Sequence, residues 1–335
     1  MIEDEEDPRV RKQPQMTKQA EDEGPKAHAR PWTRDVSHYT PRNAFLEFGS
    51  TSIKFYLVGT AGDTAGQVEK ELKIPWDLGY DVFQHSRISP RTVALSLATL
   101  RRLQREHPEI PFETVTAVGT AALREAQNAD VFQRVLWDEL RLRIHIIEGG
   151  IEAFLLETGF RDSVDAYPTG LFDLGGGSLE LVEYLSEYST KKTSLPLGAI
   201  RLHCQLRHTP DLFSYIREGR RKVESTIRAH LLGKGILSSK PTYRELIGTG
   251  GTARAIVDIL GKEVFNLEDL RSVLEREVHG PVWDQLAPHR RKAFLPGVLA
   301  IEGLFTTLGL EKVVYKTASV KRGLMTLMSL IPTAK

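Results

Sequence analysis

The stretch Asp173–Ser178 reads Asp-Leu-Gly-Gly-Gly-Ser and lies between two largely apolar segments, Gly170–Phe172 and Leu179–Val182. Apolar runs on either side of a glycine turn predict the two strands of a hairpin, with a carboxylate where the first strand ends. Glycine has no Cβ, so several backbone N–H groups of such a turn can converge on phosphate oxygens. The stretch therefore predicts a phosphate-binding loop, although one such loop alone is more often an ordinary turn.

The same arrangement occurs earlier in the chain, where the predicted strand Phe45–Phe48 contains Glu47 and runs into Gly49-Ser50-Thr51-Ser52. A strand, an acid, a glycine turn and a second strand thus occur twice, which predicts two related α/β domains. A third glycine-rich segment, Gly248–Thr252, follows a predicted strand at 245–247 and precedes a predicted helix at 253–260. The order of the three loops favours phosphate binding over three unrelated turns.

Two of these loops follow a carboxylate, and a carboxylate beside bound phosphates is repulsive unless a hard cation bridges them. The pattern therefore implies Mg²⁺, or Mn²⁺, as a cofactor. The third loop also fits the dinucleotide-binding pattern G-x-G-x-x-A, but that interpretation leaves both acid–glycine loops unexplained. The Walker A pattern is absent from the sequence, which argues against a P-loop NTPase.

The overall composition fits a globular protein and excludes several classes of partner. The formal net charge of the 335 residues is +1, so no global field favours nucleic acid or a membrane surface. Cys204 is the single cysteine, which suggests a reducing compartment, and we expect the protein to be cytoplasmic. Residues 1–40 are charged and poor in large apolar side chains, so a disordered tail is expected there.

Periodicity predicts the elements between the loops. Ser89 and Pro90 predict the start of a helix, and Asn128 is expected to cap another. Further strands are expected at 115–118, 144–147 and 313–315, with helices at about 151–158 and 213–232.

Six segments in the same order resemble the exopolyphosphatase/guanosine pentaphosphate phosphohydrolase (Ppx/GppA) family of the actin-like superfamily. The similarity runs from about Ala44 to Leu330 and matches a short form without the C-terminal HD-like extension. The segments are Val118–Asn128, Ile146–Ala153, Phe172–Leu181, Ser194–Leu202, Gly248–Thr252 and Phe294–Gly297.

The resemblance implies an α/β fold of two actin-like (ribonuclease H-like) domains, at 41–164 and 165–335, with the site in an interdomain cleft. The last helix, at about 320–331, is expected to pack back on the first domain. The resemblance also implies release of terminal phosphate from polyphosphate or pppGpp with Mg²⁺. It allows a homodimer, for which the residues themselves give no signal.

The implied roles fall on individual positions of this chain. Glu152 is the expected general base, Glu180 assists the attacking water, and Arg124 binds phosphate. The expected metal-associated residues are Asp173, Glu152 and Glu47. The expected phosphate-binding residues are Gly49, Ser50, Thr51, Gly175, Gly176, Gly177, Ser178, Gly250, Gly251, Thr252 and Arg201.

The sequence also departs from the family pattern. Glu47 stands where the family has aspartate, Thr51 replaces an asparagine, and Ile151 replaces a glutamate. These changes support an alternative, a catalytically weakened protein that binds or senses polyphosphate or guanosine polyphosphates. An actin-like kinase is a third possibility, but it gives the Arg124 and Glu152 motifs no reason to occur.

Overall fold

The computed structural model describes residues 42–59, 68–232, 243, 245–279, 288–317 and 322–323. The expected disordered tail at 1–40 lies outside these residues, as does the expected last helix at 320–331 apart from Arg322 and Gly323. Residues from Thr40 onward form one compact unit. In the described part of the chain, no helix is long and apolar enough to span a membrane.

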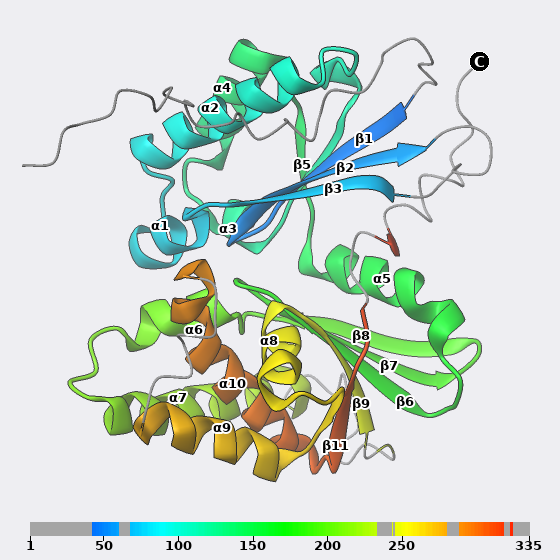
Figure 1. The fold of residues 1–335 in the computed structure, drawn as a ribbon, viewed down its shortest axis with the longest axis vertical. Helices are drawn as coiled ribbons and strands as arrows, with labels where there is room; N and C mark the ends of the chain where they lie inside the picture. Colours follow the sequence, from blue (N-terminus) through cyan, green and yellow to red (C-terminus); the bar gives the residue numbers. More distant parts are fainter. Residues whose placement is uncertain are drawn as a thin grey trace, which may run out of the picture. The chain divides into compact units, whose positions relative to one another are not determined.

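The first sheet has five strands in the order β3-β2-β1-β4-β5 (Figure 1). The first three strands are antiparallel, and β4 and β5 are added in parallel. Their bounds are β1 Arg42–Phe48, β2 Ser52–Gly59, β3 Val68–Pro75, β4 Thr116–Gly119 and β5 Ile144–Ile146.

The second sheet repeats this topology and adds one short edge strand, in the order β10-β11-β9-β6-β7-β8. Here β6, β7 and β8 are antiparallel and β9 and β11 are added in parallel, so β6 corresponds to β1 and β9 to β4. The predicted duplication of an α/β unit is confirmed. The bounds are β6 Thr169–Leu174, β7 Leu179–Ser186, β8 Ser189–Leu195, β9 Glu245–Gly250, β10 Val264–Phe265 and β11 Lys312–Tyr315.

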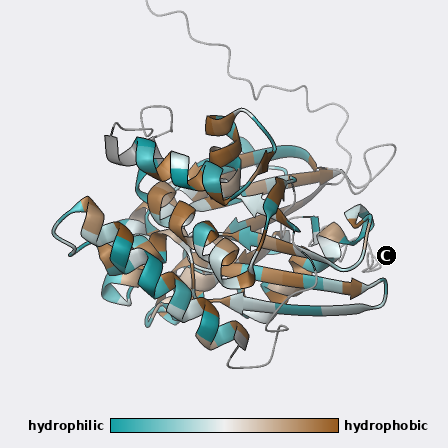
Figure 2. Cartoon of the chain, turned by 90° about the horizontal axis from the view of Figure 1, so that it is seen from below, coloured by the Kyte–Doolittle hydropathy of each residue, from teal (hydrophilic) through white to brown (hydrophobic). Residues whose placement is uncertain are grey.

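The helices cover the faces of both sheets, and Figure 2 shows hydrophobic and hydrophilic residues alternating along the helices. Side chains alternate between the two faces of a strand, so each sheet can be buried on both sides. The bounds are α1 Leu78–His85, α2 Pro90–Glu106, α3 Ala121–Glu125, α4 Ala129–Leu140, α5 Gly149–Phe160, α6 Ala199–Leu206, α7 Leu212–Ile227, α8 Gly251–Leu260, α9 Leu267–His279 and α10 Pro288–Leu308.

Helix α5 packs against both sheets. Its Leu155 joins Phe45 of β1 in one buried cluster, and its Leu156 and Phe160 join Leu171 of β6 in another. Since α5 bridges the two halves, packing alone does not assign it to either, and the domain boundaries stay predictions. This position brings the first turn of α5, which carries Glu152, to the space between the sheets.

Most predicted elements are present, with differences at their ends. Ser89 caps α2 by accepting a hydrogen bond from the N–H of Thr92 at 3.2 Å. Asn128 precedes α4, but the expected side-chain cap is wrong: its amide instead bonds the N–H and carbonyl of Ile88, at 2.8 and 3.0 Å. The long helix predicted to 232 becomes a π-helical turn after Ile227.

Candidate active site

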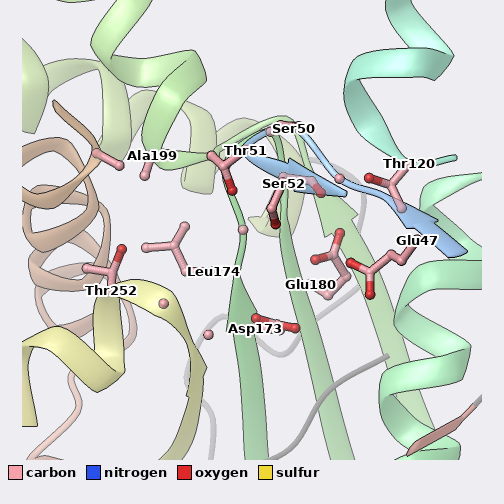
Figure 3. Close-up of a pocket in the computed structure, with 18 of the residues that line it drawn as sticks. Glu47, Ser50, Thr51, Ser52, Thr120, Asp173, Leu174, Glu180, Ala199 and Thr252 are labelled. Carbon is pink, nitrogen blue, oxygen red and sulfur yellow. The ribbon is translucent and has the colours of Figure 1, made fainter. Parts of the chain in front are cut away.

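A cavity of about 200 Å³ is lined by residues of both sheets and by all three glycine-rich loops. Figure 3 shows the side chains of Glu47, Asp173 and Glu180 on the same side of this cavity. Of the predicted site residues, the cavity is lined by Glu47, Gly49, Ser50, Thr51, Glu152, Asp173, Gly175, Gly176, Gly177, Ser178, Glu180, Gly250, Gly251 and Thr252.

The second loop is held by the N-terminus of α6. The N–H groups of Ala199 and Ile200 donate to the carbonyl oxygens of Gly175 and Gly176 at 3.0 and 2.9 Å. These bonds occupy the loop's carbonyl oxygens, which would otherwise repel an anion. The loop therefore keeps the polarity that a phosphate cradle requires.

The first and second loops lie very close to each other where they line the cavity. A Cβ on Gly176 would lie 2.7 Å from Cγ2 of Thr51, and a Cβ on Gly177 would lie 2.5 Å from Oγ of Ser50. Only glycine allows this approach of the two hairpin turns. The glycine pattern that predicted phosphate binding is thus also required for the two halves to fit together.

The third loop needs glycine for a different reason. Gly250 has φ +96°, a conformation that side chains rarely adopt, and a Cβ there would lie 2.6 Å from Oδ1 of Asp173. The next residue, Gly251, begins α8 and has open space around it. The N-terminus of α8, which is favourable for anions, therefore lies beside the carboxylate of Asp173.

Glu152 is 5% exposed and accepts a hydrogen bond from Nη1 of Arg124 at 2.8 Å. Burial raises the pKa of Glu152 to about 7, against the lowering effect of Arg124. The same Arg124 nitrogen donates to the carbonyl oxygen of Ile147 at 2.6 Å. A carboxylate with a pKa near neutrality can take up a proton at physiological pH.

The remaining acids differ in their partners. Oε1 of Glu47 is 2.6 Å from Nζ of Lys54, and its Oε2 is buried with no hydrogen-bond partner in the described part of the structure. Glu180 accepts a hydrogen bond from Oγ of Ser194 at 2.8 Å, and burial raises its pKa well above the ordinary value. Burial also raises the pKa of Asp173, to about 6, against the lowering effect of Lys54.

Comparison with known proteins identifies the family. The model of the Ppx/GppA phosphatase family matches residues 70–331, well over half of the chain. The chain belongs to the Ppx/GppA family. Its solved structural neighbours include an exopolyphosphatase from Cytophaga hutchinsonii, with a TM-score of 0.71 and 20% identity, covering 88% of this chain and 100% of that one. At this identity, the similarity supports the fold.

Two curated relatives are similar to most of this Ppx/GppA member. A guanosine-5'-triphosphate,3'-diphosphate pyrophosphatase of Aeromonas hydrophila is 27% identical over 307 residues, which cover 86% of this chain and 59% of the relative. A bifunctional 3-dehydroquinate synthase/phosphatase of Fusobacterium nucleatum is 23% identical over 300 residues, covering 81% of this chain and 44% of the relative. The chain thus spans about half the length of these relatives.

Two of the site residues that were predicted for this Ppx/GppA member do not line the first cavity. Arg124 and Arg201 line an adjacent cavity of about 370 Å³ that shares Ser178 with the first. Arg201 bonds both carboxylate oxygens of Glu125, at 2.7 and 2.5 Å, and donates to the carbonyl oxygen of Gly177 at 2.7 Å. In this arrangement Arg201 supports the second loop, and a direct phosphate contact by it stays a prediction.

Lys54, Lys73 and Ser194 contribute to the site although none of them was among the predicted site residues. The strand pairing within the first hairpin could have predicted the position of Lys54. Lys54 pairs with Glu47 across β1 and β2, and Glu180 pairs with Asp173 at the corresponding position across β6 and β7. Counting residues outward from the turn of each hairpin predicts both of these cross-strand pairs.

The site's oxygen donors suit Mg²⁺, but they do not form a complete cage. Within the described residues, no three acidic, histidine or cysteine side chains are grouped as a metal site. Mg²⁺ is usually held by one or two carboxylates together with water and substrate phosphates, so a complete protein cage is not required. The carboxylate of Asp173 fits this chemistry, and so does Oε2 of Glu47, which accepts no hydrogen bond from the residues that the structure describes.

Proposed function

We propose that the protein releases terminal phosphate from inorganic polyphosphate or pppGpp by attack of water. One observation carries the proposal: a buried glutamate with a pKa of about 7 lines the same cavity as three glycine-rich loops. The loops offer N–H donors for a phosphoanhydride, and Glu152 offers a base. Phosphoryl transfer depends mainly on this combination of positioning and charge stabilisation.

In the proposed reaction, the deprotonated carboxylate of Glu152 orients a water molecule and takes its proton. Glu180, which has a raised pKa and is held by Ser194, provides a second group near the water. Arg124 carries a positive charge at the boundary of the two cavities and can contact a phosphate oxygen there. A bound Mg²⁺ would neutralise the phosphate charge beside Asp173.

A binding or sensing function is the alternative, and two ion pairs favour it. Lys54 already pairs with Glu47, and Arg124 already pairs with Glu152, so both acids have a positive partner before any substrate binds. A protein with such pairs can bind polyphosphate without rapid turnover. Its affinity for polyphosphate would then be high, while the rate of phosphate release would stay close to that of the uncatalysed reaction.

A phosphate-release panel separates these functions. Polyphosphates of several lengths, pppGpp, ATP and ADP would be incubated with the protein and Mg²⁺ or Mn²⁺, and binding would be measured by calorimetry in parallel. Multiple turnovers with polyphosphate or pppGpp support the hydrolase. Tight binding without turnover supports the sensor, and transfer of phosphate to an acceptor other than water would indicate a kinase.

A further inference from the structure

A separate cavity of about 560 Å³ is lined by residues of α6, α7 and α10 and shares no lining residue with the candidate active site. Ala199 of α6 and Phe294 of α10 line the active-site cavity, whereas His203 of α6 and Leu295 of α10 line this one. Figure 1 shows α6, α7 and α10 close together on one side of the second sheet. The cavity therefore belongs to the helical layer and uses none of the glycine-rich loops.

Its walls combine apolar and aromatic groups. Leu206, Leu212 and Pro296 supply apolar surface, and the rings of His203 and Tyr215 lie 6.4 Å apart with their polar atoms in contact, Nδ1 to hydroxyl, at 3.2 Å. Burial lowers the pKa of His203. Apolar walls with a few fixed polar groups are typical of small-molecule sites, and ring faces suit a planar ligand.

Two cations at this cavity lack an acidic partner in the described part of the structure. Arg207 bonds the imidazole Nε2 of His208 at 2.9 Å and the amide oxygen of Gln84 at 2.6 Å. The ammonium group of Lys292 lies 5.1 Å from the ring centre of Tyr80. Neither contact neutralises a positive charge, so the cavity favours an anion.

One carboxylate also lines the cavity, that of Asp211, but it is already engaged. Its two oxygens accept from the N–H and the hydroxyl of Ser214 at 2.8 and 2.9 Å, at the start of α7. These bonds lower the pKa of Asp211, so it stays ionised. Among the described residues that line the cavity, cationic side chains still outnumber it, and its remaining oxygen lone pairs can accept hydrogen bonds from a ligand's amino or hydroxyl groups.

We propose that this cavity binds a planar aromatic anion of the class of a nucleoside monophosphate. The ring packs between the apolar wall and Tyr215, and the phosphate is held by Arg207 and Lys292. The site is distinct from the phosphate-cleaving cavity, so the proposal does not depend on the proposed hydrolase activity.

Calorimetry with AMP and GMP as probes tests this site on the full chain, with Mg²⁺ omitted. The charge reversals Arg207→Glu and Lys292→Glu should each weaken binding at least about 10-fold, because each removes a charge-assisted contact and adds repulsion. Arg134→Glu, an exposed reversal on α4, is the matched control and should leave binding unchanged. Circular dichroism would verify that all variants are folded.

Ligand fragments and a competitor complete the test. Adenosine alone and inorganic phosphate alone should each bind more weakly than AMP by about 10-fold or more, because each lacks one half of the proposed contacts. Excess polyphosphate should not displace AMP, and Glu152→Gln should bind AMP as the unchanged protein does. The proposal is overturned if both reversal variants bind AMP as tightly as the unchanged protein, if polyphosphate displaces AMP, or if neither nucleotide binds.

Discussion

Arg124 and Glu152 form an ion pair, with Nη1 of the arginine 2.8 Å from Oε2 of the glutamate. The pair joins the two cavities, because Arg124 lines one and Glu152 lines the other. Opposing effects act on the pKa of Glu152: burial and the nearby carboxylates of Glu47 and Asp173 raise it and the guanidinium lowers it, leaving it at about 7. Arg124 therefore tunes the proposed base in addition to any contact with phosphate.

The first prediction concerns pH. A general base works only when deprotonated, so kcat/KM should rise with pH through about 7. Arg124→Met removes the lowering effect and should shift this rise to higher pH. Arg124→Lys keeps a positive charge and should shift it less. Phosphate release measured from pH 5 to 9 checks this, and an unchanged midpoint in Arg124→Met would argue against the tuning role.

The second prediction uses two adjacent glycines. Gly250→Ala places a Cβ 2.6 Å from Oδ1 of Asp173 and strains a residue with φ +96°, so activity should fall at least about 10-fold. Gly251→Ala meets no other protein atom at the start of α8 and should lower activity less than Gly250→Ala, with equal or higher stability. Thermal melting and phosphate release would be measured for both variants. Equal activities would contradict the role assigned to Gly250.

The third prediction concerns the cation. Asp173 forms no ion pair with another described residue, whereas Oε1 of Glu47 lies 2.6 Å from Nζ of Lys54. Asp173→Asn should therefore raise the Mg²⁺ concentration for half-maximal activity by about 10-fold or more, and Glu47→Gln should raise it less. Titration of activity with Mg²⁺ distinguishes them. A larger effect of Glu47→Gln would assign the main contact with the cation to Glu47 instead of Asp173.

Much of this site could be predicted from local sequence, because its signals lie within short segments. The Asp173–Ser178 loop and the earlier Glu47–Ser52 loop each carry an acid, a turn and the following strand, so the duplication was visible. The family resemblance supplied Glu152 and Arg124, which short-range patterns alone do not distinguish from surface charges. Their role nevertheless depends on burial, which sequence does not report.

The features that were not predicted depend on long-range packing. Arg201 lies 76 positions from Glu125 yet bonds it, and this contact places the arginine beside the second loop. Helix α5 contacts both sheets, a position that its apolar pattern does not reveal. Asn128 had the right place to cap α4, but a tertiary contact with Ile88 uses its side chain instead.

The proposed hydrolase rests on Glu152 as the base, and its replacement by glutamine is the most direct test. Glutamine keeps the size of the side chain but cannot take a proton from water. Phosphate release from polyphosphate and pppGpp would be compared among the unchanged protein, Glu152→Gln, and the control Glu187→Gln, which alters an exposed glutamate. Melting temperatures and substrate binding would be measured alongside.

We expect Glu152→Gln to lower kcat by about 100-fold to 10,000-fold while substrate still binds, and Glu187→Gln to behave as the unchanged protein. Mg²⁺-dependent phosphate release that continues at its original rate in Glu152→Gln would contradict the proposed mechanism.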